Sequence, residues 1–269
     1  MTALDSKSRF SSRVSDYAKY RPGYPLALLT HLAKECGLTP EAVIADIGSG
    51  TGLLSQYLLN NGNAVIGVEP NPAMREAAEL FLVEQVHFRS LDGSAEATGL
   101  MSHTVDFIVA AQAFHWFDRA KTRQEWLRIL KPGGWVVLIW NDRQVDSTPF
   151  LAAYEAILQE FGTDYNEINH KNVQNEPLLR AFFGADFQCA HFENGQRFDL
   201  DGLIGRVASS SYCPERGSAR FDAMEKKLNE AFAAHAQQGY VTFEYDTLMY
   251  YGHMQPDSVD RLSMPMRDI

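Results

Sequence analysis

The feature that most constrains the fold is a short apolar run that ends in a glycine-rich loop. Val43–Ile47 is followed at once by Gly48, Gly50 and Gly52, and residues 53–60 then have a helix-forming composition. An apolar run of this length is typical of a strand buried on both faces of a sheet. Glycines let the loop turn tightly and let a ligand approach the backbone, and the following helix presents unpaired N–H groups. A strand–loop–helix unit of this kind is the usual ligand crevice of an open α/β sheet.

Strands and helices alternate along the chain after this unit. Apolar runs predict seven strands, at residues 43–47, 65–68, 86–90, 105–111, 135–140, 187–192 and 241–250. Residues 131–134, with the sequence Lys-Pro-Gly-Gly, predict a turn before the fifth strand. Helical patterns at 199–211 and 220–235 lie between the last two strands. The expected fold is therefore α/β, with a Rossmann-like, mostly parallel seven-stranded sheet, helices on both faces, and a helical cap inserted before the last strand.

Composition argues against several classes of partner and site. The formal net charge is -10, so a polyanion such as nucleic acid is a poor partner. The three cysteines lack CxxC spacing and the histidines lack metal-ligand spacing, which indicates neither disulfides nor a metal site. No apolar run approaches the roughly 18 residues of a membrane span, and residues 1–15 lack a signal-peptide core. We therefore expect a cytoplasmic protein without a membrane partner, whose oligomeric state is unknown.

Glycine spacing and one acidic residue select the ligand. A dinucleotide fingerprint reads G-x-G-x-x-G, but here the third glycine position is occupied by Leu53. Glu69 ends the second predicted strand, where a carboxylate can accept both hydroxyls of an adenosine ribose. This pattern favours S-adenosylmethionine (SAM) over a nicotinamide dinucleotide. A SAM-binding regulatory protein without turnover is the alternative to an enzyme.

Several motifs, in this order, resemble class I SAM-dependent methyltransferases of the trans-aconitate and ubiquinone-biosynthesis-like branch. The segments that carry the resemblance are 43–52, 67–71, 93–96, 105–117 and 130–134, and 17–25 is similar to the N-terminal arm of this branch. The resemblance implies in-line transfer of a methyl group from SAM to a small-molecule acceptor. It also implies one methyltransferase domain over 1–269. That domain divides into an arm and helix (1–36), a SAM-binding core (37–141), and the remaining strands (142–269) with a cap near 199–238.

The resemblance also assigns cofactor-binding residues. They lie in the arm and after the first four strands: Tyr17, Arg21, Asp46, Gly48, Ser49, Gly50, Glu69, Pro70, Asn71, Met74, Ser94, Ala95, Glu96, Ala111 and Gln112. Glu69 would hold the ribose hydroxyls, and Ala95 would offer its backbone N–H to the adenine. Many relatives carry Asp at the position of Ser94, and the shorter serine would lose the bond to the adenine amino group.

The sequence leaves the acceptor open, since O-, N- and C-methylation all fit. His115 is the candidate general base, although a histidine that binds a backbone carbonyl is the plainer reading, and a carboxylate acceptor would need no base. Acceptor-binding candidates are Tyr20, Trp116, Trp140, Arg206 and Tyr212. Arginines in the cap would suit a carboxylic acid, whereas a solvated charged face and ordinary aromatic packing are the plainer readings.

Overall fold

The computed structural model describes residues 19–163, 165, 176–184, 186–210 and 212–256. In chain order the strands are β1 (Val43–Ile47), β2 (Ala64–Val68), β3 (Phe88–Leu91), β4 (Val105–Ala111), β5 (Leu130–Arg143), β6 (Gln188–Phe198) and β7 (Val241–Gly252). They form one sheet in the order β3-β2-β1-β4-β5-β7-β6. The first five strands pair in parallel, and β7 runs antiparallel to both of its neighbours.

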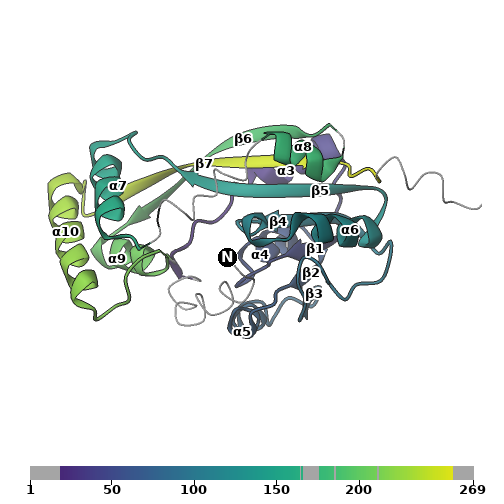
Figure 1. Ribbon diagram of the computed structural model, residues 1–269, viewed down its shortest axis with the longest axis horizontal. Coiled ribbons are helices and arrows are strands. Elements are labelled where there is room, and N and C mark those ends of the chain that lie inside the picture. The colour runs from purple at the N-terminus through teal and green to yellow at the C-terminus, as the bar shows by residue number, and fades with distance from the viewer. Residues whose placement is uncertain (1–18, 164, 166–175, 185, 211, 257–269) are drawn as a thin grey trace, which may run out of the picture.

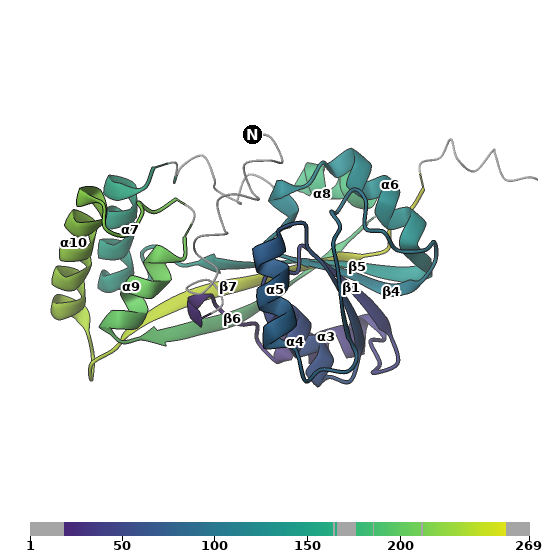
Figure 2. The ribbon, with the colours of Figure 1, turned by 90° about the horizontal axis from the view of Figure 1, so that it is seen from below.

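Helices cover both faces of this sheet (Figure 2). They are α3 (Ala27–Cys36), α4 (Leu53–Asn60), α5 (Pro72–Phe81), α6 (Arg119–Ile129), α7 (Pro149–Phe161), α8 (Glu176–Phe183), α9 (Leu200–Ala208) and α10 (Ala219–His235), with a 3-10 turn, η1 (Phe114–Trp116). Helices α6 and α8 pack on one face, and α3 and α4 pack on the other. The predicted fold class is confirmed.

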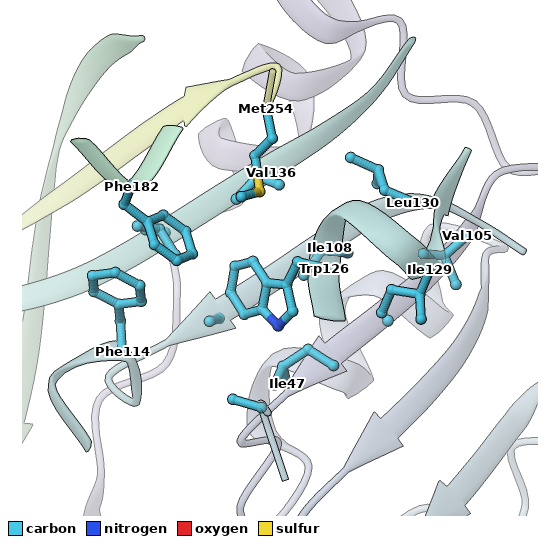
Figure 3. Packing of buried hydrophobic residues seen from close by; sticks show 14 of the residues in the cluster. Ile47, Val105, Ile108, Phe114, Trp126, Ile129, Leu130, Val136, Phe182 and Met254 are labelled. Carbon is cyan, nitrogen blue, oxygen red and sulfur yellow. The ribbon is translucent and has the colours of Figure 1, made fainter. Parts of the chain in front are cut away.

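An aromatic cluster fills the layer between the sheet and helices α6 and α8. Trp126 of α6 is fully buried, with its ring centroid 5.4 Å from that of Phe182. The ring centroids of Phe114 and Phe182 lie 4.6 Å apart. Figure 3 shows Ile47 of β1 on the side of the Trp126 indole that faces away from these two rings. This cluster fixes η1, the turn that follows β4, against the sheet.

Strands β5, β6 and β7 continue past the sheet core and carry a second group of helices (Figure 1). We call α7, α9 and α10 the cap lobe; their apolar faces form one buried cluster with the first residues of β7. The predicted insertion before the last strand is present as α9 and α10. Helix α7 adds to it from an earlier part of the chain. No helix in the described ranges is long and apolar enough to cross a membrane.

Residues 131–134 depart from the predicted turn. Strand β5 begins at Leu130 rather than Trp135 and includes these residues. The pairing with β4 jumps from Val105–Leu130 to Phe107–Trp135, so the extra residues form a bulge, with Gly133 at φ +77°. A bulge accommodates additional residues without ending the strand. The Gly-Gly signal therefore marks an irregularity within β5 rather than a boundary.

Candidate functional site

The glycine loop after β1 has the geometry of a ligand-binding turn. Gly48 has φ +72°, and a Cβ there would stand 2.6 Å from the Cβ of Ala113, so a side chain is excluded. Gly50 has φ +57°, and no described atom lies within 4 Å of where its Cβ would stand. Side chains therefore cover the backbone at Gly48 and leave it uncovered at Gly50. A ligand can approach the backbone on that open side.

Glu69 ties this loop to the end of β2. Its Oε2 accepts the N–H of Gly50 at 3.0 Å, and its Oε1 accepts the N–H of Asn71 at 2.9 Å. The residue is 9% exposed. A carboxylate offers about four acceptor positions, so one that binds two loop N–H groups can also receive ribose hydroxyls.

Asp46 places a second carboxylate beneath the same loop. It is buried, and its Oδ2 accepts the Ser55 hydroxyl at 2.7 Å. Burial raises the pKa of Asp46 to about 7, the Ser55 hydrogen bond opposes that rise, and the charge of Glu69 adds to it. The site therefore holds one carboxylate that titrates close to neutral pH.

The loops after β2 and β3 stand beside the glycine loop because their strands are neighbours in the sheet. Asn71 caps α5, its side chain accepting the N–H groups of Ala73 and Met74. Its side chain is thus used to start a helix. Met74 is buried, and Pro70 and Ser49 are partly exposed.

After β3, Ser94 and Ala97 exchange two backbone hydrogen bonds, of 3.1 and 3.2 Å. This pairing closes a tight turn with Ala95 and Glu96 at its tip. Ala95 is 3% exposed, and Glu96 Oε1 accepts the N–H of Asp118 at 2.8 Å.

The turn after β4 lies at the same carboxyl edge of the sheet as the loops after β1, β2 and β3. Gln112 adopts φ +56°, donates its N–H to the carbonyl of Ile139, and reaches the carbonyl of Asn141 with its side chain. A positive φ at a non-glycine residue is uncommon and is typical of functional turns. The turn leads from Ala111 into η1, where the His115 and Trp116 rings lie 4.9 Å apart. The predicted SAM-binding residues after β1 to β4 therefore gather at the carboxyl edge of four adjacent strands.

The N-terminal arm joins this edge to the cap lobe. Tyr17 lies outside the described residues. The Tyr20 ring packs tightly on Gly205. A Cβ added to Gly205 would stand 2.1 Å from the nearest carbon of this ring. Arg21 donates to the carbonyl of Ser209 at 3.0 Å. The carbonyl of Gly23 accepts from the side chains of two asparagines in the sheet, Asn141 and Asn194.

Two of the remaining candidates lie in the cap lobe. Arg206 is 6% exposed and donates to Ser210 Oγ at 2.9 Å and to the Tyr245 hydroxyl at 3.4 Å. Tyr212 packs against Tyr165 with ring centroids 4.9 Å apart.

Trp140 lies elsewhere, in the aromatic core. It is fully buried, with its ring centroid 6.2 Å from Phe114 and 5.8 Å from Tyr250. Its ring therefore packs among the aromatic residues of the sheet core, away from the cap lobe.

The structure also shows a pocket of about 520 Å³ that the sequence reasoning missed. It is lined by Asp142, Arg143, Gln144, Val145, Asp146, His191, Asp246 and Leu248. Asp246 accepts from His191 at 2.7 Å and from Gln144 at 3.2 Å. The available signal was the polar run directly after the apolar part of β5. Among the described residues, no cluster of three or more His, Cys, Asp or Glu side chains is arranged to hold a metal ion.

Known proteins share this sequence pattern and geometry. A family described as "Methyltransferase domain" matches residues 45–138, which include the glycine loop, Glu69 and Gln112. The Mycobacterium tuberculosis protein named uncharacterized methyltransferase Rv3342 is 31% identical over 209 residues, covering 78% of this chain and 79% of that protein. This similarity extends beyond the glycine loop into the cap-bearing part of the chain.

Solved structures agree on the fold. A protein from Anaeromyxobacter dehalogenans described as a type II methyltransferase matches with a TM-score of 0.65 at 21% identity, over 88% of this chain and all of that one. A Haemonchus contortus phosphoethanolamine N-methyltransferase, solved with S-adenosylhomocysteine, matches with a TM-score of 0.54 at 14% identity, over 94% of this chain and 59% of that one. The glycine loop, the acid after β2 and the relationship to Rv3342 lead to one conclusion: the chain belongs to the SAM-dependent methyltransferases, and SAM is its methyl donor.

Proposed function

We propose that the enzyme methylates a small-molecule carboxylic acid and that Arg206 binds the acid. The observation that carries this proposal is a buried guanidinium whose hydrogen-bond partners, within the described part of the chain, are hydroxyl groups. Among the described residues, no carboxylate forms an ion pair with Arg206. A buried charge that lacks a counter-charge is costly, because hydroxyl groups replace only part of the lost hydration. An acidic ligand would supply the missing charge.

Arg143, the last residue of β5, lies against α7 of the same lobe and supports this interpretation by contrast. It is almost as deeply buried, with a side chain 10% exposed, but it forms an ion pair with Glu155 and a 3.1 Å hydrogen bond to Tyr165. Its guanidinium also lies over the Tyr154 ring, 4.8 Å from the centroid. Within the described ranges, the fold therefore provides an internal carboxylate for one buried arginine and none for the other. We interpret the second as a ligand-binding residue.

At the donor end, we propose the roles that the strand-edge geometry allows. Glu69 binds the ribose hydroxyls, and Gly48 and Gly50 approach the methionine part of SAM. Ala95 donates its backbone N–H to the adenine. A lone pair of the acceptor oxygen forms a C–O bond while the S–CH₃ bond breaks, which leaves neutral S-adenosylhomocysteine and a methyl ester. Because a carboxylate is already ionised at neutral pH, no proton transfer is needed, and His115 would position the acceptor.

A second candidate function follows from the acidic pocket. Asp142, Asp146 and Asp246 line it together, which would favour an amine that arrives as a cation. That amine would first lose a proton to a pocket carboxylate or to water, and its nitrogen lone pair would then form the N–CH₃ bond while the S–CH₃ bond breaks, so the reaction would be N-methylation. The two candidates predict chemically different products. A methyl ester is hydrolysed by base and releases methanol, whereas an N-methyl group survives the same treatment.

The test is a metabolite extract incubated with the enzyme and SAM that carries an isotopically labelled methyl group. Mass spectrometry identifies the labelled product, and base treatment then separates esters from N-methyl compounds. We expect a base-labile product. A base-stable amine as the sole product would favour the second candidate and overturn the first.

The role of Arg206 has its own test. In Arg206→Met we expect the KM for the acid to rise at least tenfold, equivalent to about 1.4 kcal/mol or more, because a charged hydrogen bond is lost. The Kd for S-adenosylhomocysteine should stay within about twofold of the wild-type value. The matched control is Arg197→Gln, which changes an exposed arginine on β6. An unchanged KM in Arg206→Met would contradict the assignment.

A further inference from the structure

Helix α6 is tied to the turn between β3 and β4 at two separate points. We call residues 93–98 the adenine turn. Near its tip, Glu96 accepts the N–H of Asp118, the residue that caps α6. At its end, Thr98 binds Glu125, which lies on the second turn of α6. The helix therefore holds the segment that contains Ala95.

Glu125 makes a dense set of hydrogen bonds. Its Oε1 accepts the N–H of Thr98 at 2.9 Å and the hydroxyl of the same residue. Arg128 donates to both oxygens of Glu125 at 2.7 Å and also reaches the carbonyl of Leu100 at 2.8 Å. The Glu125 side chain is 10% exposed, and Thr98 is fully buried. Residues 98–100 are thus fixed to α6 by one carboxylate and one guanidinium.

The charge on Glu125 strengthens this attachment. Burial by itself favours the protonated form, but the hydrogen bonds from Arg128 and Thr98 outweigh it and hold the pKa of Glu125 below its ordinary value. The group is therefore ionised at neutral pH. Hydrogen bonds to an ionised acceptor are roughly twice as strong as those between neutral groups.

The turn is too tight to absorb a displacement of Thr98. A Cβ on Gly93 would stand 2.9 Å from the Thr98 carbonyl oxygen and 3.0 Å from Val68, so the two ends of the turn are packed together. The Ser94–Ala97 hydrogen bonds couple the tip to this base. A movement of Thr98 therefore moves the N–H of Ala95. Hydrogen bonds weaken steeply with misalignment, so the adenine contact would suffer.

From these contacts we infer that Glu125 is a positioning residue for adenine recognition: it holds Thr98 and thereby sets the direction of the Ala95 N–H. The role proposed for Glu125 acts through Thr98 and requires no contact with SAM. The inference rests on the proposed role of Ala95 and is independent of the identity of the acceptor.

Calorimetry with two ligands tests this role. S-adenosylhomocysteine carries an acceptor at N1 of its base, whereas S-inosylhomocysteine carries a hydrogen there, which an N–H donor would oppose. In Glu125→Ala we expect S-adenosylhomocysteine to bind about tenfold more weakly. Binding of the inosine analogue should weaken less. The ratio of the Kd for S-inosylhomocysteine to the Kd for S-adenosylhomocysteine should therefore fall at least about threefold. Glu125→Gln should be intermediate, because its amide oxygen can still accept from Thr98.

Controls separate positioning from general destabilisation. Gln124→Ala changes an exposed neighbour on α6 and should match the wild type for both ligands. If Glu125→Ala does not fold, Thr98→Val removes the hydroxyl while keeping the shape, and it should lower the same ratio. An unchanged ratio in the folded variants would overturn the inference. Failure of the wild type to bind S-adenosylhomocysteine would overturn it together with the donor-site roles, whereas an amine acceptor would leave it intact.

Discussion

At the residue scale, two acids beneath the glycine loop are held in different ways. Glu69 receives N–H groups from Gly50 and Asn71, so its charge is compensated by the backbone. Asp46 is more deeply buried and receives the Ser55 hydroxyl. Burial consequently raises the pKa of Asp46 to about 7. The methionine part of SAM is positively charged at its sulfonium and ammonium groups, and its arrival would favour the ionised form of a nearby carboxylate.

This difference predicts a pH effect on stability. The pKa of Asp46 is higher in the folded protein, about 7, than its ordinary value of 3.8, so the folded state binds the proton more tightly. Stability should therefore fall as pH rises from about 4 to 7 and level off above. Between pH 5 and pH 8, the loss due to Asp46 is roughly 2 to 3 kcal/mol.

In Asp46→Asn this contribution should disappear. Urea unfolding without SAM gives the free energy of unfolding of each protein at pH 5 and at pH 8. The contribution of Asp46 is the change between these pH values in the wild type minus the change in Asp46→Asn. The same pH dependence in Asp46→Asn and wild type would show that Asp46 does not titrate in this range.

At the element scale, the N-terminal arm is a spacer between the sheet and the cap lobe. The Tyr20 ring lies against Gly205 of α9, and Arg21 reaches the end of that helix at Ser209. The Gly23 carbonyl is bound by side chains of β5 and β6. Three residues in the arm thus fix the distance between the cap lobe, which holds Arg206, and the strand edge proposed to bind SAM.

Gly205→Ala tests this arrangement. The added methyl would collide with the Tyr20 ring, so the arm should shift, at a cost of about 1 to 3 kcal/mol in unfolding free energy. Hydrogen exchange of residues 20–24 should become faster. Adding Tyr20→Ala makes room for the methyl, so the two changes together should cost less than the sum of each alone. Strict additivity would argue against the contact.

At the scale of the whole molecule, one sheet connects two groups of helices. The first five strands, with α3, α4, α6 and α8, form the core, and the proposed donor site lies at the carboxyl edge of β1 to β4. The long β5, β6 and β7 carry the cap lobe (Figure 1). The donor site thereby depends on the packing of α6. That helix both fills the core with Trp126 and holds the adenine turn with Glu125.

Trp126→Ala should therefore affect stability and binding together. Loss of a fully buried tryptophan costs about 3 to 5 kcal/mol. Urea unfolding measures this loss. In conditions where the variant remains folded, S-adenosylhomocysteine should still bind more weakly, because α6 no longer holds the turn in place. Wild-type affinity in a destabilised variant would indicate that the turn keeps its position without this packing.

Local sequence patterns predicted the core of the sheet well, and they were weaker outside it. Strands β1 and β4 are buried almost throughout, so their apolar runs were plain in the sequence. Helix α8 was missed, although Leu179, Phe182 and Phe183 have helical spacing and are buried. It is only eight residues long, and its stability comes from packing on α6 and the sheet rather than from its own propensity. The polar end of β5 was missed because its pairing with β7 lies far away in sequence.

The sequence by itself determined the donor half of this protein: the strand, the glycine loop and Glu69 lie close together in the chain, and their chemistry is local. Only the tertiary structure decided what surrounds Arg206 and which element holds the adenine turn. Glu125 looks like any charged residue of a surface helix until α6 is packed beside Thr98. Burial and pairing of a charge depend on neighbours that are distant in sequence, and folding alone brings them together.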